Sequence, residues 1–134
     1  MKFTIPGEPT AKGRPRFTKT GRTYTPEKTA NYEAMVGWYF NQTKTDDFEM
    51  LQDCVTANII CYFKIPNSMS KKNTVKAEYG VLRPTKKPDL DNIAKSILDS
   101  LNGLAYKDDS QVIGLQIEKY YSKEPRVEVE LMEV

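Results

Sequence analysis

Residues 90–101 carry the periodic pattern that most constrains how this chain can fold. Apolar side chains recur there at positions i, i+3, i+4, i+7, i+8 and i+11, which predicts an amphipathic helix with one buried face. Pro88-Asp89 marks the start of this helix, and Asn102-Gly103 is typical of its end. The apolar members are Leu90, Ile93, Ala94, Ile97, Leu98 and Leu101.

A second helix is predicted from Thr25 to about Asn41. Thr25 suits the N-cap, Pro26 the first helical position and Glu27 the first turn. The aromatic and apolar residues that follow recur at helical spacing, so we expect them to pack in a core rather than to stack on bases. They are Tyr32, Met35, Val36, Tyr39 and Phe40.

Segments of alternating or β-branched residues predict strands around these helices. The predicted strands are residues 2–5, a central strand at 55–65, and a closing pair at 111–121 and 126–134. We also expect a small hairpin around Thr20-Gly21, a variable loop at 41–54, a short helix at 68–79 and a loop at 80–87. A length of 134 residues suits one domain. The expected fold is a single compact mixed α/β domain, residues 1–134, with a mixed sheet flanked by helices.

The absence of histidine narrows the possible chemistry. Histidine is the commonest general base near neutral pH and the commonest transition-metal ligand, so Ser-His-Asp hydrolases, papain-like proteases and zincins are excluded together. Cys54 and Cys61 are too few for a disulfide framework or a zinc site, and we expect two reduced thiols. No apolar segment is long enough to span a membrane, so we expect a cytoplasmic protein.

Charge is unevenly distributed although the formal net charge is only +2. Residues 1–24 and 64–87 hold six and seven basic residues, each against a single acidic one, whereas residues 108–134 are rich in Asp and Glu. Two basic segments around an acidic site suit a polyanionic substrate, although solvated surface is the alternative for each lysine. The candidate phosphate contacts are Lys12, Arg14, Arg16, Lys19, Lys71, Lys72 and Lys76.

Two carboxylates, Asp89 and Asp91, stand at the start of the helix at 90–101, and Lys95 follows Asp91 by one turn. A structural role alone would explain them: Asp89 as an N-cap, Asp91 as a complement to the helix dipole, and Asp91 with Lys95 as a surface ion pair. A third acidic cluster, Asp108-Asp109, can fold back toward the helix start, because eight loop residues reach about 26 Å. Three converging carboxylates without imidazole or thiolate favour Mg²⁺, with Mn²⁺ as a substitute.

Three motifs together resemble the RusA family of Holliday junction resolvases. They are PGEPTAKGRPRF near the N-terminus, DLDN with Lys95 and the downstream LDSLNG, and KDDSQV after that. The resemblance implies a Mg²⁺-dependent, homodimeric endonuclease of mixed α/β fold that resolves branched DNA by paired nicks in recombination and repair. The family is frequent in bacteriophages and prophages. Asp89, Asp91 and Asp109 match its metal-binding catalytic carboxylates, and Lys95 matches its catalytic lysine.

Two other functions remain open from the residues alone. A non-catalytic nucleic-acid module could grip single strands with basic loops and exposed aromatics such as Phe17, Tyr24 and Tyr106. A small structural protein could use the same acids as caps and surface pairs. The sequence does not distinguish junctions from flaps or forks, one metal ion from two, or ligands from one subunit and from both.

Overall fold

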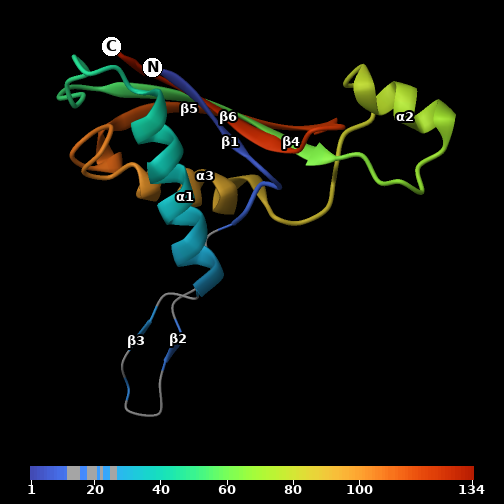
Figure 1. Cartoon of the computed structure of the whole chain (residues 1–134), viewed down its shortest axis with the longest axis horizontal. Helices are drawn as coiled ribbons and strands as arrows, with labels where there is room; N and C mark the ends of the chain where they lie inside the picture. Colours follow the sequence, from blue (N-terminus) through green and yellow to red (C-terminus); the bar gives the residue numbers. More distant parts are fainter. Residues whose placement is uncertain (12–15, 18–20, 22, 25–26) are drawn as a thin grey trace.

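A four-stranded mixed sheet forms the centre of the molecule, in the strand order β1-β6-β4-β5 (Figure 1). The structure is a computed structural model that describes residues 1–11, 16–17, 21, 23–24 and 27–134. The strands of this sheet are β1 (Lys2–Pro6), β4 (Val55–Lys64), β5 (Val112–Ser122) and β6 (Arg126–Glu133). A separate two-stranded ribbon joins β2 (Arg16–Phe17) to β3 (Thr23–Tyr24) in antiparallel register, which confirms the predicted hairpin.

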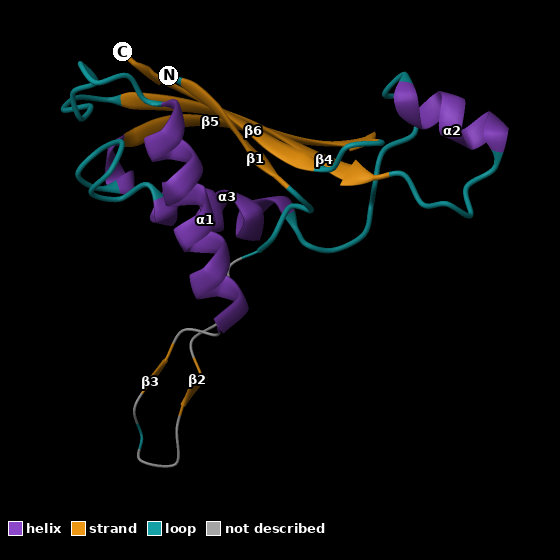
Figure 2. Ribbon diagram, viewed as in Figure 1, coloured by secondary structure: helices purple, strands orange, loops and turns teal. Residues whose placement is uncertain are grey.

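Helices α1 (Glu27–Thr43) and α3 (Leu90–Ser100) cover one face of the sheet, whereas α2 (Lys71–Glu78) stands beyond its end (Figure 2). A short 3-10 turn, η1 (Asp109–Gln111), leads into β5. The prediction of a sheet flanked by helices is therefore confirmed on one face. Within the described part of the chain, no helix is both long and apolar enough to cross a membrane.

Strand β4 is the central strand, as predicted. Its side chains alternate between buried and more exposed along nearly its whole length, because successive residues point to opposite faces of the sheet. The buried set faces the helices and is made of Val55, Ala57, Ile59, Cys61 and Phe63. The open face carries polar and aromatic side chains, including Asn58 and Tyr62.

The prediction that residues 111–121 and 126–134 pair with each other is wrong. Strand β5 runs parallel to β4 along one edge, and β6 runs antiparallel to β4 along the other and separates it from β1. The short segment Lys123–Pro125 crosses over the end of β4. Alternation predicts which face a side chain takes, but it says nothing about which strand lies alongside.

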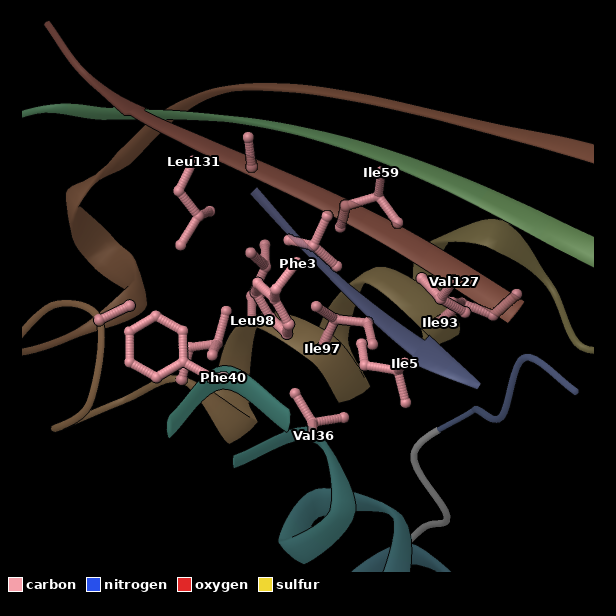
Figure 3. Close-up of a cluster of buried hydrophobic side chains, with 14 of the residues drawn as sticks. Phe3, Ile5, Val36, Phe40, Ile59, Ile93, Ile97, Leu98, Val127 and Leu131 are labelled. Carbon is pink, nitrogen blue, oxygen red and sulfur yellow. The ribbon is translucent and has the colours of Figure 1, made fainter. Parts of the chain in front are cut away.

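The core lies between the sheet and the pair α1 and α3 (Figure 3). The predicted face of α3 is buried, with Ile93, Ile97 and Leu101 fully inaccessible to solvent. The predicted stripe of α1 also packs there: Val36 and Phe40 are fully buried, and Phe40 meets Phe3 of β1 edge to face at a centroid distance of 5.5 Å. The positions of Asp89, Asp91 and Lys95 are thus set by apolar burial on the opposite side of α3.

The ends of the helices lie close to their predicted positions. Helix α1 extends two residues beyond its predicted end, and its predicted cap, Thr25-Pro26, lies outside the described residues. The short helix predicted at 68–79 is present as α2, where the Ser70 hydroxyl accepts a hydrogen bond from the Asn73 amide at 3.2 Å. Helix α3 ends at Ser100, two residues before Asn102.

Candidate active site

Asp89 occupies the N-cap position of α3, but its side chain does not cap the helix. Its backbone is extended, as the position requires, and its carbonyl accepts the hydrogen bond from the Ile93 amide. The carboxylate makes no capping hydrogen bond and is exposed to solvent. Asp89 is therefore placed by the helix start, and within the described part of the chain its carboxylate has no hydrogen-bond or ion-pair partner.

Asp91 and Lys95 are both exposed on α3, one turn apart. The surface ion pair that a purely structural reading predicts is not formed: among the described residues, no contact within 4.0 Å joins the Asp91 carboxylate to the Lys95 ammonium. An exposed pair at this spacing contributes only a few tenths of a kcal/mol. The ion pair therefore does not account for Asp91 and Lys95, although Asp91, in the first turn of α3, does complement the positive end of the helix dipole.

Asp108 has a structural role that distinguishes it from Asp109. Its carboxylate accepts a hydrogen bond from the Ser110 amide at 3.0 Å, and the Gln111 side chain accepts one from the Asp108 amide at 3.2 Å, which completes a capping box for η1. The hydrogen bonds from Ser110 hold the pKa of Asp108 below its usual value. Gln111 also donates to the carbonyls of Leu51 and Asp53, so this turn is fixed to the body.

Asp109 projects instead toward α3, where its carboxyl group shares a hydrogen bond with that of Asp99. This hydrogen bond, partial burial, and the charges of Asp99 and Asp108 together raise the pKa of Asp109 to about 6. Such an arrangement is costly in the absence of a cation, because two ionised carboxylates in contact repel each other. It favours a cation or a proton at this position.

Asp99 was not identified by the sequence reasoning. It stands eight residues after Asp91 and four after Lys95, so the three side chains share one face of α3. The spacing can be seen in the sequence, but it does not distinguish Asp99 from any other polar residue on the exposed face of an amphipathic helix. The structure identifies it by its contact with Asp109.

The acidic residues fall into two groups at opposite ends of α3. Asp89 and Asp91 stand at its N-terminal end, and Asp99 with Asp109 at its C-terminal end. Eight residues of helix separate Asp91 from Asp99, about 12 Å along the axis at 1.5 Å per residue. Among the residues that the structure describes, no three Asp, Glu or Cys side chains gather closely enough in one chain to hold a metal ion. The predicted convergence of Asp89, Asp91 and Asp109 is thus not made within one chain.

The segment that leads into Asp89 is fastened to the edge strand β5. Arg83 donates from Nε to the Lys119 carbonyl at 2.7 Å, and its guanidinium lies 4.0 Å from the centre of the Tyr120 ring. In return, Lys119 Nζ donates to the Lys86 carbonyl at 2.6 Å. The Tyr62 ring also lies next to Tyr120, tilted by 32° with the ring centroids 6.0 Å apart. Two side chains and two carbonyls therefore hold the segment before Asp89 against β5.

The candidate phosphate contacts are only partly covered by the structure. Lys71, Lys72 and Lys76 are exposed on α2. Lys12, Arg14 and Lys19 lie outside the described residues, and only the backbone of Arg16 is described.

One of the three aromatic residues expected to stack on bases in a non-catalytic nucleic-acid module is not exposed. Tyr106, expected to be exposed, is fully buried, and its hydroxyl donates to the Leu98 carbonyl at 2.7 Å. The prediction was wrong because the loop after α3 folds back onto the core and takes this ring with it. The side chains of Phe17 and Tyr24 lie outside the part that is described.

Comparison with known proteins adds an independent observation. The family model described as Endodeoxyribonuclease RusA matches residues 6–132. The uncharacterized protein YqaN of Bacillus subtilis (strain 168) is 43% identical over 139 residues, which covers 100% of this chain and 96% of that protein. The crossover junction endodeoxyribonuclease rusA of Lactococcus phage r1t is 41% identical over 51 residues, 37% of this chain and 39% of that protein.

Proposed function

This chain belongs to the RusA family of endodeoxyribonucleases, and we propose that it resolves four-way DNA junctions, or related branched DNA, by paired nicks in recombination and repair. The observation that carries the proposal is the exposure of Asp89, Asp91 and Lys95 on α3. Among the described residues, neither a capping bond of the Asp89 carboxylate nor an Asp91–Lys95 ion pair is formed.

The donor set fits a hard divalent cation. Nucleases of this family generally depend on a divalent metal ion. The chain has no histidine, and the candidate ligands are carboxylates, which suit Mg²⁺ and its substitute Mn²⁺. The proposed ligands are Asp89, Asp91 and Asp109. Asp108 is left out because its carboxylate is engaged in the capping box.

We assign the third ligand to a second copy of the chain. Asp109 stands at the opposite end of α3 from Asp91, and among the described residues of one chain no three acidic or cysteine side chains gather to hold a metal ion, which supports this assignment. In a twofold dimer, a contact between residues i and j is repeated with the subunits exchanged. Two α3 helices lying antiparallel across the axis would set Asp91 of each subunit opposite Asp109 of the partner subunit. Dimerisation would then be a condition for metal binding as well as for paired nicks.

The side chains divide the work of phosphodiester hydrolysis. When bound, the cation would make a water molecule more acidic and neutralise phosphoryl oxygen charge. Asp89, Asp91 and Asp109 would hold it against the scissile phosphate. Lys95, one turn beyond Asp91, would neutralise the negative charge that develops on the phosphorane or on the leaving 3′ oxygen. In the metal-free protein, the same ammonium group offsets repulsion among the carboxylates.

The basic segments supply the grip on DNA. Lys71, Lys72 and Lys76 on α2, with Lys12, Arg14, Arg16 and Lys19 near the N-terminus, would contact backbone phosphates. Such contacts release counterions, so the logarithm of affinity should fall steeply with the logarithm of salt concentration.

The test is cleavage of a synthetic four-way junction by the purified protein in Mg²⁺. Paired nicks in opposing strands are expected from the wild type. Asp91→Asn should abolish cleavage while junction binding stays equal or becomes tighter, because a negative charge next to the phosphate is removed. Asp46→Asn, an exposed acid after α1, serves as the control and should cut normally. Absence of Mg²⁺-dependent nicking in the wild type would contradict the proposal.

A further inference from the structure

Helix α2 stands beyond the end of the sheet, apart from α1 and α3, and contacts the sheet at β5 (Figure 1). It lies in the connection between β4 and α3, which we call the α2 arm (residues 66–87). Ser70 caps its start, and its end is closed by the amides of Val81 and Leu82, which donate to the Lys76 carbonyl. Gly80 adopts φ +76° there, a conformation that glycine accepts readily. The arm therefore presents its side chains at fixed positions.

One face of α2 gathers cations and apolar groups together. At 100° per residue, the members of this face fall within an arc of about 140°. They are Lys71, Lys72, Val75, Lys76 and Tyr79, which we call the arm face. The opposite side holds Ala77, which is buried at 1% exposure. Glu78 lies outside the arc and pairs with Lys123 at 3.3 Å, so the arm face carries three positive charges and no negative one.

The two apolar members of the arm face are unusually open. Tyr79 is 80% exposed and Val75 is 51% exposed, and among the described residues no aromatic ring or cation lies against Tyr79. An aromatic ring between lysines suits a ligand that offers both phosphates and flat apolar surfaces. A protein partner is less suited, since lysine is depleted at protein interfaces. Charge complementarity therefore selects nucleic acid as the occupant.

The arm is tied to the segment that ends in the catalytic motif. Arg83 and Lys119 fasten residues 83–86 to β5, and Tyr120 packs under Gly80, where an added Cβ would stand only 3.2 Å from the ring. Ten residues of chain separate Tyr79 from Asp89, so the arm face lies within about 33 Å of the catalytic carboxylates. DNA held by the arm can therefore continue to the site on α3.

We propose that the arm face recognises the branch point of the DNA, with Tyr79 stacked on a base exposed there and the three lysines on the adjoining phosphates. This assignment rests on the proposed function for its substrate class. Paired bases within a duplex are stacked on both sides and offer no free face to Tyr79, whereas bases at a branch point are more readily unstacked. The arm face thus contributes selectivity for branched over linear DNA.

The test measures binding in the Asp91→Asn background, in which cleavage is removed. The probes are a four-way junction with 2-aminopurine at the branch point and a linear duplex with the same base in its interior. Tyr79→Ala should weaken junction binding about tenfold and leave duplex binding unchanged, since stacking is lost at the branch only. Tyr79→Phe retains the ring and should restore both the affinity and the fluorescence change of 2-aminopurine.

Lys72→Ala provides the contrast within the same face. It should weaken binding to both DNAs and lower the slope of log affinity against log salt by about one, because it removes one phosphate contact. Equal effects of Tyr79→Ala on the two DNAs, no effect on either, or an altered oligomeric mass would overturn the assignment to the branch point.

Failure of this inference is distinguishable from failure of the proposed function. A wild type that cuts junctions with Mg²⁺ but whose Tyr79→Ala variant keeps full selectivity contradicts the arm face alone. A wild type that never cuts, yet loses junction selectivity in Tyr79→Ala, contradicts the nuclease and supports the arm face.

Discussion

The carboxyl groups of Asp99 and Asp109 share a hydrogen bond, although the first lies on α3 and the second opens the turn before β5. Two ionised carboxylates cannot donate to each other, so the bond requires a proton between them. The pKa of Asp109 is accordingly raised to about 6. A divalent cation could replace that proton. The interaction between Asp99 and Asp109 should therefore change when a metal ion binds.

The titration of Asp109 provides the first prediction. In the metal-free protein, we expect its side-chain carboxyl signal to titrate near pH 6 by ¹³C NMR. Asp99→Asn should move that midpoint down toward the usual value of 3.8, because the charge is removed and the amide can donate to the carboxylate. An unchanged midpoint in Asp99→Asn would show that Asp99 is not the cause.

The same contact has a consequence for stability. A carboxyl group whose pKa is higher in the folded chain stabilises the fold at low pH, and this contribution is lost as pH rises from about 3.8 to about 6. Relative to wild type, metal-free Asp99→Asn should therefore resist urea better at pH 7 than at pH 4.

Anchoring of the Arg83 side chain should affect catalysis more than folding. Arg83→Gln loses the contact with the Tyr120 ring, the ion pair with Glu118 at 3.4 Å and the hydrogen bond to the Lys119 carbonyl, so we expect the Asp89 segment to shift. We expect junction cleavage to slow about tenfold, since small misplacements of catalytic groups are costly. The control is Arg126→Gln: Arg126 stacks on Tyr62 at 3.9 Å but holds the turn between β5 and β6. A similar slowing in both variants would argue against a positioning role for Arg83.

Lys95 should act on the chemical step and not on binding. We expect Lys95→Gln to lower the single-turnover cleavage rate by roughly 10²-fold, because a positive charge near the developing phosphorane is lost. Junction affinity should stay close to that of wild type. Lys44→Gln, an exposed lysine after α1, should cut at the normal rate. If Lys95→Gln loses affinity in proportion to rate, Lys95 binds phosphate in the ground state instead.

The packing of α3 against the sheet predicts a large difference between two isoleucines. Ile97 is fully buried, whereas Ile113 on the edge strand is 63% exposed. Ile97→Ala should lower the free energy of unfolding by about 3 kcal/mol, since it removes buried methyl groups and leaves a cavity. Ile113→Ala should change it by less than about 0.5 kcal/mol. Urea denaturation measures both, and equal losses would contradict the described core.

Much of the fold could be predicted because the residues that are buried recur at regular spacing in the sequence. The apolar spacing of Ile93, Ile97 and Leu101 predicts α3, and the β-branched and aromatic residues of β4 predict the central strand. The neighbours of β5 and β6 could not be predicted, because strand pairing depends on the path of the chain around β4. Tyr106 was misjudged for a related reason: its burial comes from a loop that folds back, which no local pattern reports.

The site was predictable only in part. Asp89, Asp91 and Lys95 lie at the N-cap and in the first turns of one helix, so their positions follow from the helix itself. The separate fates of Asp108 and Asp109 follow from a capping box with Gln111, which requires coordinates to recognise. The separation of Asp109 from Asp91 by most of the length of α3 was not expected, because a flexible loop could have reached either end.

Mixed dimers test most directly whether the proposed metal-binding carboxylates converge from two chains. Asp91→Asn and Asp109→Asn subunits, each expected to be inactive alone, carry different affinity tags so that the mixed dimer can be isolated. With ligands from both chains, one site of the mixed dimer keeps every carboxylate and the other loses two. We therefore predict Mg²⁺-dependent nicking of one junction strand by the mixed dimer. If each chain supplied its own complete site, both sites would be damaged, and a mixed dimer that binds the junction without nicking it would contradict the proposal.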